Sequence, residues 1–340
     1  MPIDRHHRQQ LLPGWGVAGQ ARVRNARVVV VGVGALGCVS SELLCRAGVG
    51  HLTVVDRDVV EATNLQRQVL YAEADLGRPK AEAAAGRLRA IDSAVTVEPV
   101  IAHADAERIE DLVRGADVLI DGTDNFETRY LLNDAAIAFG IPMVYGGAVA
   151  TRGTVLPVLP GVGPCLRCLH ADTPAALETC DTAGVLASAV AWVGARQAAL
   201  ACRILIDGPS SVPPRLEASD AWTGAHHGID IADAADPDCP CCVRRNFEHL
   251  DGLHGAETKT LCGRNSVQII TTHSECRSLD SLAERLRHHG RFRVAESLLS
   301  GTLDRENGLA LTVFPDGRAI VHGTDDQDRA RAVYDRYIGS

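Results

Sequence analysis

A valine-rich stretch that ends in a glycine-rich turn limits the possible folds of this chain more than any other feature. Residues 27–31 read Arg-Val-Val-Val-Val, and the next six are Gly-Val-Gly-Ala-Leu-Gly, where a helical pattern begins. Glycines at this spacing allow a tight turn and close approach of the backbone to a phosphate, which the helix N-terminus also favours. We therefore predict a nucleotide-binding loop at Gly32, Gly34 and Gly37. The motif alone does not distinguish NAD, FAD and ATP.

Strand-like and helix-like patterns alternate after this turn. Strands are predicted at residues 27–31, 51–55, 95–101, 117–121 and 142–148, with helices between them at 35–48, 78–91, 104–113 and 125–139. Such alternation predicts an α/β fold with a Rossmann-like, mostly parallel sheet and helices on both faces. Residues 215–231 suggest antiparallel strands, so we expect an antiparallel extension of the sheet.

The chain length and a polar stretch indicate two domains. A chain of 340 residues is too long for one typical domain and short for three. Residues 1–250 are expected to form the nucleotide-binding domain and residues 251–260 a linker. Residues 261–340 then form a small α+β module, in which Phe314-Pro315-Asp316-Gly317 is a hairpin-turn signal.

Charge and hydropathy exclude some partners. The formal net charge of −9 argues against nucleic acid or an anionic membrane as the main partner. The most apolar long stretch, residues 186–206, contains Arg196, Gln197 and Arg203, which favours a buried helix over a membrane span. Residues 1–10 are polar and basic and do not resemble a signal peptide, so we expect a cytoplasmic protein.

Carboxylates and cations follow the predicted strands. Asp56 ends the second strand, where a carboxylate can hold ribose hydroxyls. Arg67 and Lys80 fit an enzyme that acts at a phosphoryl centre, although either one alone is better explained as a solvated surface charge. Asp124 can hold Mg²⁺ on a triphosphate; alternatively, Asp124 or Asn125 caps the next helix.

The cysteines predict a metal site. Eleven cysteines in a chain without a secretion signal favour metal binding or thiol chemistry over a disulfide framework. Cys165, Cys168, Cys239 and Cys242 form two C-x-x-C pairs, which predicts a closed, structural Zn²⁺ site that clips two distant segments together. Cys241 is an alternative ligand, although its C-x-C pairing with Cys239 is less usual.

The other cysteines divide into one candidate nucleophile and several core residues. Cys180 lies in a polar segment just before the long apolar helix, where a helix N-terminus lowers a thiol pKa; the alternative is a small buried side chain. Cys38, Cys45 and Cys202 fall within apolar helical patterns and are expected to be buried.

Together these motifs resemble the ubiquitin-activating-type adenylyltransferases, whose bacterial members are called ThiF, MoeB and HesA. The resemblance spans residues 5–246 and consists, in chain order, of R-x-x-R-Q, G-x-G-x-x-G, D-x-D-x-V, N-L-Q-R-Q, G-x-P-K, T-D-N and the paired C-x-x-C. It implies ATP-dependent adenylylation of the C-terminal glycine carboxylate of a ubiquitin-like sulfur-carrier protein, with release of pyrophosphate. Residues 1–250 are then the adenylation domain, and thiamine and molybdopterin biosynthesis are candidate pathways.

The resemblance also implies residue roles and a symmetric homodimer. Cys180 corresponds to a cysteine that links covalently to the carrier in some relatives and is dispensable for adenylylation in others. The remaining implied roles are the glycine loop beside the phosphates, Asp56 on the ribose, Asn64, Gln66, Arg67 and Lys80 at the nucleotide, Asp124 on Mg²⁺, Arg8 on the triphosphate of the neighbouring subunit, and the four paired cysteines on Zn²⁺.

Two other functions would also use a nucleotide-binding loop. A nicotinamide-dependent oxidoreductase would leave Arg67, Lys80, Asp124 and the paired cysteines without a joint purpose. A non-catalytic nucleotide-binding adaptor for a ubiquitin-like protein would keep the same motifs. Residues 262–265, Cys-Gly-Arg-Asn, do not fit a sulfurtransferase loop, so we do not expect this chain to supply its own sulfur.

Overall fold

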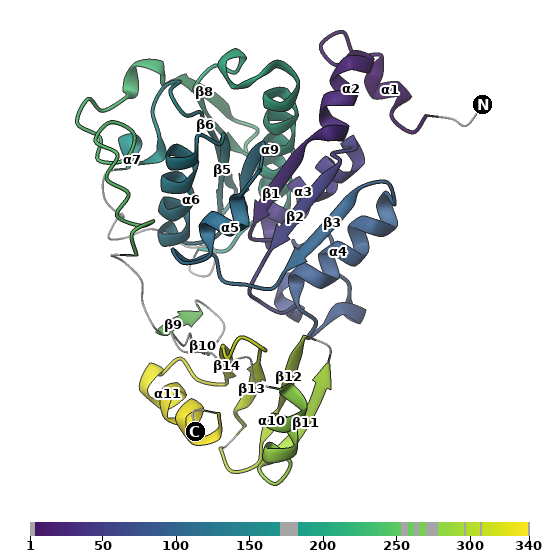
Figure 1. The fold of residues 1–340 in the computed structure, drawn as a ribbon, viewed down its shortest axis with the longest axis vertical. Coiled ribbons are helices and arrows are strands. Elements are labelled where there is room, and N and C mark those ends of the chain that lie inside the picture. The colour runs from purple at the N-terminus through teal and green to yellow at the C-terminus, as the bar shows by residue number, and fades with distance from the viewer. Residues whose placement is uncertain are drawn as a thin grey trace. The chain divides into compact units, whose positions relative to one another are not determined.

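The computed structural model contains two compact units, Met1–His254 and Gly255–Ser340 (Figure 1). The structure describes residues 4–170, 183–252, 258–261, 265–269, 278–295, 297–306 and 308–338. The boundary between the units lies within the stretch that the sequence predicts as a linker.

The first unit is built on an eight-stranded sheet with the order β3-β2-β1-β4-β5-β6-β7-β8. The first five strands in chain order are parallel, and β6, β7 and β8 continue the sheet antiparallel. This arrangement confirms the predicted α/β fold with an antiparallel extension. The strands are β1 (Arg27–Val31), β2 (His51–Val55), β3 (Thr96–Val100), β4 (Val118–Asp121), β5 (Met143–Val149), β6 (Arg152–Val158), β7 (Arg215–Asp220) and β8 (His226–Asp230).

Helices cover both faces of this sheet (Figure 1). Because side chains alternate along a strand, β1 sends Val28 and Val30 into the core beneath α3, α4 and α9, and Val29 and Val31 into the core beneath α5 and α6. A parallel sheet buried on both faces needs such continuous apolar strands. The helices that the structure describes in this unit are α1 (His7–Gln10), α2 (Gly16–Asn25), α3 (Ala35–Ala47), α4 (Lys80–Ile91), α5 (Ile109–Val113), α6 (Phe126–Phe139), α7 (Leu166–Leu169) and α9 (Ala187–Asp207).

Helix α9 is an interior helix. Among the described residues it is the only helix whose length and composition would allow it to cross a membrane, but 61% of its apolar window is buried inside the protein. Gln197, which is fully buried, donates hydrogen bonds to the carbonyl oxygens of Asp121 (2.7 Å) and Val144 (3.2 Å). These contacts tie α9 to the carboxyl end of β4, as expected for a helix that packs on the sheet.

Three glycines lock the turn after β1 against the turn after β4. Gly32 has a φ of +86°, which favours glycine, and a Cβ there would lie 2.7 Å from the backbone of Gly122. A Cβ on Gly37 would lie 1.9 Å from the carbonyl oxygen of Gly32. The tight turn expected from the glycine spacing is therefore present, and the contact of Gly32 with Gly122 brings two loops together at one edge of the sheet.

The second unit is a six-stranded antiparallel sheet with two helices, in the order β11-β12-β13-β14-β10-β9. One face packs against α10 and α11 around a core that includes Val267, Leu311 and Val333. Its elements are β9 (Thr258–Leu261), β10 (Ser266–Ile269), α10 (Leu279–Leu286), β11 (Gly290–Ala295), β12 (Leu298–Leu303), β13 (Ala310–Val313), β14 (Ala319–His322) and α11 (Gln327–Tyr337).

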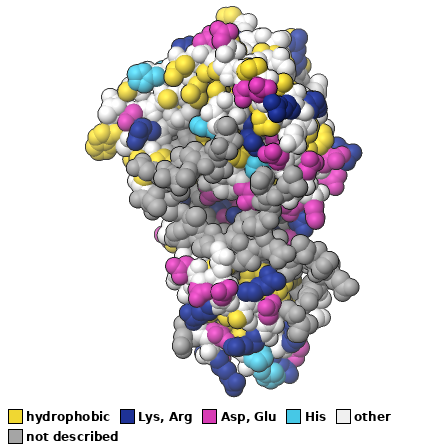
Figure 2. All heavy atoms as spheres, turned by 90° about the vertical axis from the view of Figure 1, so that its left-hand side faces the viewer, with side chains coloured by type: hydrophobic (Ala, Val, Ile, Leu, Met, Phe, Trp, Pro, Cys, Tyr) yellow, Lys and Arg dark blue, Asp and Glu magenta, His cyan; other side chains and the backbone are white. Residues whose placement is uncertain are grey.

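Figure 2 shows the side of the molecule on which α6 and α7 lie in Figure 1. Among the residues drawn in colour, Lys and Arg are interspersed with Asp and Glu, and hydrophobic side chains gather near the top of the first unit. The described part of this face therefore has charges of both signs, unlike the continuous basic surface of a nucleic-acid-binding protein.

Candidate active site and metal centre

The glycine-rich loop, Asp56 and the loop that carries Asp124 lie at the carboxyl ends of β1, β2 and β4. Val31 pairs with Asp121 across the sheet, and the N–H of Gly32 donates to the carbonyl of Val55 (2.8 Å). The strand order reverses at β1, which has β2 on one side and β4 on the other. In open parallel sheets this switch point is where ligands bind.

Asp56 is fixed directly to the glycine-rich loop. One carboxylate oxygen accepts the N–H of Val33 and the other accepts the N–H of Asp58, both at 2.8 Å. Burial raises the pKa of Asp56, and the nearby Lys80 ammonium opposes that rise. Each oxygen has a further lone pair, so the carboxylate can also accept ribose hydroxyls.

Lys80 lies in the same cluster, at the start of α4. Its ammonium is almost fully buried and lies 3.4 Å from a carboxylate oxygen of Asp58. The hydroxyl of Tyr71 donates to the carbonyls of Val33 (2.7 Å) and Lys80 (3.2 Å), so it ties the glycine loop to this segment. Asp58 and Tyr71 therefore position Lys80 beside the loop.

The residues of the N-L-Q-R-Q segment, 64–68, differ in burial and in their hydrogen-bond partners. Asn64 is buried and accepts the N–H of Glu61 (3.2 Å), while Gln66 is exposed and Arg67 donates to the carbonyl of Thr63 (2.9 Å). Gln68 is buried, and its side-chain carbonyl has no hydrogen-bond partner among the described residues. The sequence did not predict a nucleotide role for this residue. Its amide nitrogen lies 3.8 Å from where a Cβ on Gly34 would be, so Gln68 faces the loop.

The loop after β4 leaves one carboxylate at the surface. Asn125 caps α6 by accepting the N–H of Thr128 (2.9 Å), so Asp124 is not the cap; its carboxylate is exposed. Beneath it, the fully buried Asp121 accepts the N–H (2.9 Å) and hydroxyl (2.6 Å) of Thr123. This buried carboxylate shapes the loop that presents Asp124.

Arg8 lies far from the glycine loop of its own chain. The neighbouring Gln9 donates to the carbonyl of Ala47 (2.9 Å), the last residue of α3, whereas the glycine loop precedes the first. Because α3 has 13 residues, its two ends are about 20 Å apart. Arg8 is exposed, and none of the described residues holds it in a hydrogen bond or ion pair.

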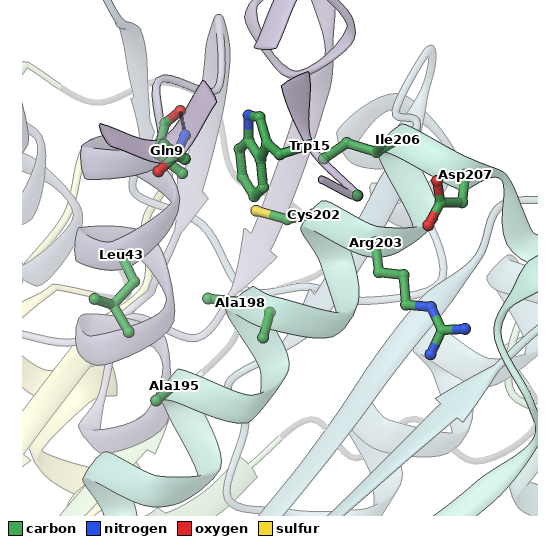
Figure 3. A pocket seen from close by; sticks show the side chains of 12 residues that line it. Gln9, Trp15, Leu43, Ala195, Ala198, Cys202, Arg203, Ile206 and Asp207 are labelled. Carbon is green, nitrogen blue, oxygen red and sulfur yellow. Dashed lines mark hydrogen bonds between the residues drawn. The ribbon is translucent and has the colours of Figure 1, made fainter. Parts of the chain in front are cut away.

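A hollow of about 310 Å³ lies at this end of α3, between α3, α9 and the segment around Trp15 that precedes α2 (Figure 3). Its lining is largely apolar and includes Trp15, Leu43, Cys202 and Ile206, whose side chains Figure 3 shows around the opening. Because its lining contains none of the nucleotide-loop glycines, it is not the nucleotide site.

The four paired cysteines form one cluster, as their spacing predicts. Their sulfurs all lie within 4.8 Å of one another; Cys165 is 3.7 Å from Cys239, and Cys168 is 3.4 Å from Cys242. Hydrogen bonding from Cys241 lowers the pKa of Cys165 to about 4, whereas burial raises that of Cys239 to about 11. Four sulfurs this close require a cation to ionise together, and a tetrahedral set of thiolates is the donor set that Zn²⁺ prefers.

The remaining cysteines are distinct from this cluster. Cys241 is buried beside it but is not one of the four clustered ligands. Burial raises the pKa of Cys38 and of Cys202 to about 12 and that of Cys45 to about 11, as expected for core thiols. Cys180, the predicted nucleophile, lies outside the described residues.

Comparisons with known proteins agree with this geometry. The profile of the ThiF family matches residues 6–241. The chain is 40% identical over 337 residues to the sulfur carrier protein ThiS adenylyltransferase of Bacillus subtilis, covering 98% of this chain and 99% of that protein. It is also 40% identical over 258 residues to the SAMP-activating enzyme E1 of Haloferax volcanii, covering 75% and 94%.

A solved structure shows the same fold. The crystal structure of E. coli MccB with MccA-N7isoAsn superimposes with a TM-score of 0.63 and 24% identity, covering 70% of this chain and 75% of that chain. At this level of identity the likeness concerns the arrangement of strands and helices alone.

Proposed function

This chain belongs to the ThiF family, and from that membership we propose how its residues act. It is an adenylyltransferase that uses ATP to adenylylate the C-terminal carboxylate of a ubiquitin-like sulfur-carrier protein. The observation that carries this conclusion is the likeness, along nearly the whole chain, to a ThiS adenylyltransferase. This likeness favours adenylylation over the oxidoreductase alternative. We propose that the substrate is a ThiS-type carrier protein in the cytoplasm.

The reaction is an in-line displacement at phosphorus. The terminal glycine carboxylate of the carrier attacks the α-phosphate of ATP, a new C–O–P linkage forms, and the bond to the β-phosphate oxygen breaks. Pyrophosphate leaves with the displaced charge, and the carrier acyl-adenylate remains. Such a reaction needs little acid–base chemistry, because alignment and stabilisation of phosphate charge lower the barrier.

The residues at the carboxyl ends of the strands supply these two effects. We assign the free N–H groups at the start of α3 to the phosphates and Asp56 to the ribose. Lys80 and Arg67 neutralise triphosphate charge. Asn64 and Gln66, in the same segment as Arg67, contact the nucleotide. We assign Gln68 to the nucleotide as well, because its side chain faces Gly34. Asp124, exposed beside this loop, would hold Mg²⁺, which neutralises phosphate charge when bound.

We expect Asp58→Asn to lower kcat about tenfold, because Asp58 holds the Lys80 ammonium in place. Loss of one charge-assisted hydrogen bond costs roughly 1.5 kcal/mol of transition-state stabilisation, which corresponds to about a tenfold change in rate. The rate is measured by pyrophosphate release at saturating ATP. Asp111→Asn is the matched control, since Asp111 pairs with Arg114 on the surface. Equal rates for both variants would show that Asp58 does not position Lys80.

The position of Arg8 favours a homodimer. Arg8 can contact a triphosphate only if the site belongs to a second copy, because α3 separates it from the loop of its own chain by about 20 Å. Leu11, Leu12 and Val17 follow it on the surface with 68%, 54% and 71% exposure, next in sequence to Trp15 of the apolar hollow. We propose that Leu11, Leu12 and Val17 contact the second copy, since they follow Arg8, the residue that we assign to the site of the other subunit.

The zinc centre has a structural role in this proposal. Cys165, Cys168, Cys239 and Cys242 would hold Zn²⁺ in a closed site, which when bound cross-links the segment after β6 to the segment after β8. No step of the adenylylation passes through it.

We expect Cys180→Ala to keep carrier-dependent pyrophosphate release within about twofold of the wild-type rate, because in-line displacement needs no protein nucleophile. The variant is then tested for a later step by looking for a covalent adduct with the carrier under non-reducing conditions. A folded Cys180→Ala protein without pyrophosphate release would show that this thiol belongs to the adenylylation site.

Mass spectrometry of the carrier tests the function itself. After incubation with this chain, Mg²⁺ and ATP, the carrier is expected to gain the mass of one adenylyl group, which hydroxylamine should remove. An adaptor that only binds the carrier would leave its mass unchanged. Calorimetry should in parallel detect binding of ATP and not of NAD.

A further inference from the structure

The proposed reaction does not explain why a buried asparagine, Asn133, lies in the middle of α6. It is fully buried, and both ends of its amide are engaged. Its oxygen accepts the N–H of Leu166 (2.8 Å), between the cysteines of the first pair. Its nitrogen donates to the sulfur of Cys241 (3.2 Å), between the cysteines of the second pair. One side chain therefore contacts both cysteine segments.

Two contacts of Cys241 also join these elements, since its thiol hydrogen-bonds Cys165 and the Asp134 carboxylate. The paired sulfurs of Cys165 and Cys239 are 74 residues apart in sequence, so local chain geometry does not fix their distance. Asp134 also reaches the second segment, by accepting the N–H of His249 (3.0 Å), but that contact lies seven residues beyond Cys242. Arg167 and Glu248 join the segments at 3.4 Å through partly exposed side chains.

We propose that Asn133 is a positioning residue for the metal centre: its amide, carried by a rigid helix, sets the spacing of the two cysteine pairs so that they accept one tetrahedral divalent cation. This inference rests on the zinc centre of the proposed function. It also explains Cys241, whose sulfur is the acceptor through which the second pair is held and is not a ligand.

The size of the expected effect follows from the two hydrogen bonds. Removing the amide leaves the N–H of Leu166 buried without its acceptor, and it removes the contact of α6 with the Cys241 sulfur that Asn133 makes. Outer partners of metal ligands typically change metal affinity by about 10–100-fold when they are lost. We expect the same range for Asn133.

The test is a competition for Zn²⁺ between the full-length chain and a chromogenic chelator. Asn133→Leu, which keeps the volume but loses both hydrogen bonds, should bind Zn²⁺ about 10–100-fold more weakly than wild type. Gln197→Met is the matched control, because Gln197 is an equally buried amide that contacts no cysteine segment; its zinc affinity should be unchanged.

Three outcomes decide the question. If Asn133→Leu is folded and binds Zn²⁺ as tightly as wild type, the positioning role is wrong while the zinc centre stands. If wild type itself holds no Zn²⁺, the zinc centre and this inference fail together. If Asn133→Leu does not fold, Asn133→Ala decides, since it loses the same two hydrogen bonds without adding an apolar side chain: weaker zinc affinity supports the inference and unchanged affinity overturns it.

Discussion

Arg8→Ala and Asp124→Ala subunits, each nearly inactive alone, are expected to recover up to about a quarter of wild-type activity when mixed. Each substitution removes charge stabilisation of the triphosphate, and an arginine supplied in trans is worth roughly 10³-fold or more in well-studied phosphoryl transfers. If Arg8 acts across the dimer, a mixed dimer has one site with both defects and one with neither. Random mixing makes about half of the dimers mixed, which gives about a quarter of the sites intact.

The experiment needs proof that subunits exchange. Differently tagged subunits, mixed and then analysed by native mass spectrometry, report the fraction of mixed dimers. As a control, Arg8→Ala mixed with Arg8→Ala of the other tag should recover nothing. Verified exchange without any return of activity would place Arg8 in its own subunit's site or outside the mechanism.

Cys168→Ser is expected to lose the metal and a large part of the stability of the first unit. Structural zinc contributes about 10–16 kcal/mol to folding in zinc-finger peptides, so even a fraction of that lowers the melting temperature by many degrees. Plasma emission spectrometry should find one zinc per wild-type chain and less in the variant, and calorimetry should find the lower melting temperature.

Cys45→Ala is the matched control for this loss. It removes a buried thiol that lies outside the cluster, so it should keep the zinc and lose only the stability of a small core cavity. A wild-type protein without zinc, or a Cys168→Ser variant with unchanged metal content and melting temperature, would contradict the structural role of the cluster.

The regular part of the fold could be predicted from the sequence because local patterns there agree with tertiary structure. The predicted parallel strands all appear, with boundaries within two residues, since strands buried on both faces need unbroken apolar runs. The predicted helix at 104–113 forms only from Ile109, because the Asp105 carboxylate accepts the N–H of Arg108 (3.0 Å) in a turn. Strands β6, β9, β11 and β12 were not predicted; their sequences contain glycine or polar residues, and β9 begins within the predicted linker 251–260.

The candidate site could be predicted where a residue type carries its own chemistry. The glycine loop, Asp56 and the four cysteines follow from spacing, whereas Lys80 follows only from the family resemblance and is buried rather than a solvated surface charge. Gln68 and Asn133 could not be found in this way. Their roles depend on which amides face the loop and the cysteine segments, and that becomes visible only when α6 and the N-L-Q-R-Q segment are placed in space.

Carrier-dependent exchange of pyrophosphate into ATP measures the proposed reaction itself, because it reports reversible formation of the acyl-adenylate. We expect exchange that requires this chain, Mg²⁺, ATP and a ThiS-type carrier ending in a free glycine carboxylate, and that stops when that carboxylate is amidated. A folded, ATP-binding preparation that shows no exchange with any ubiquitin-like carrier, or equal exchange with the amidated carrier, would mean that this chain does not adenylylate the carrier's terminal carboxylate.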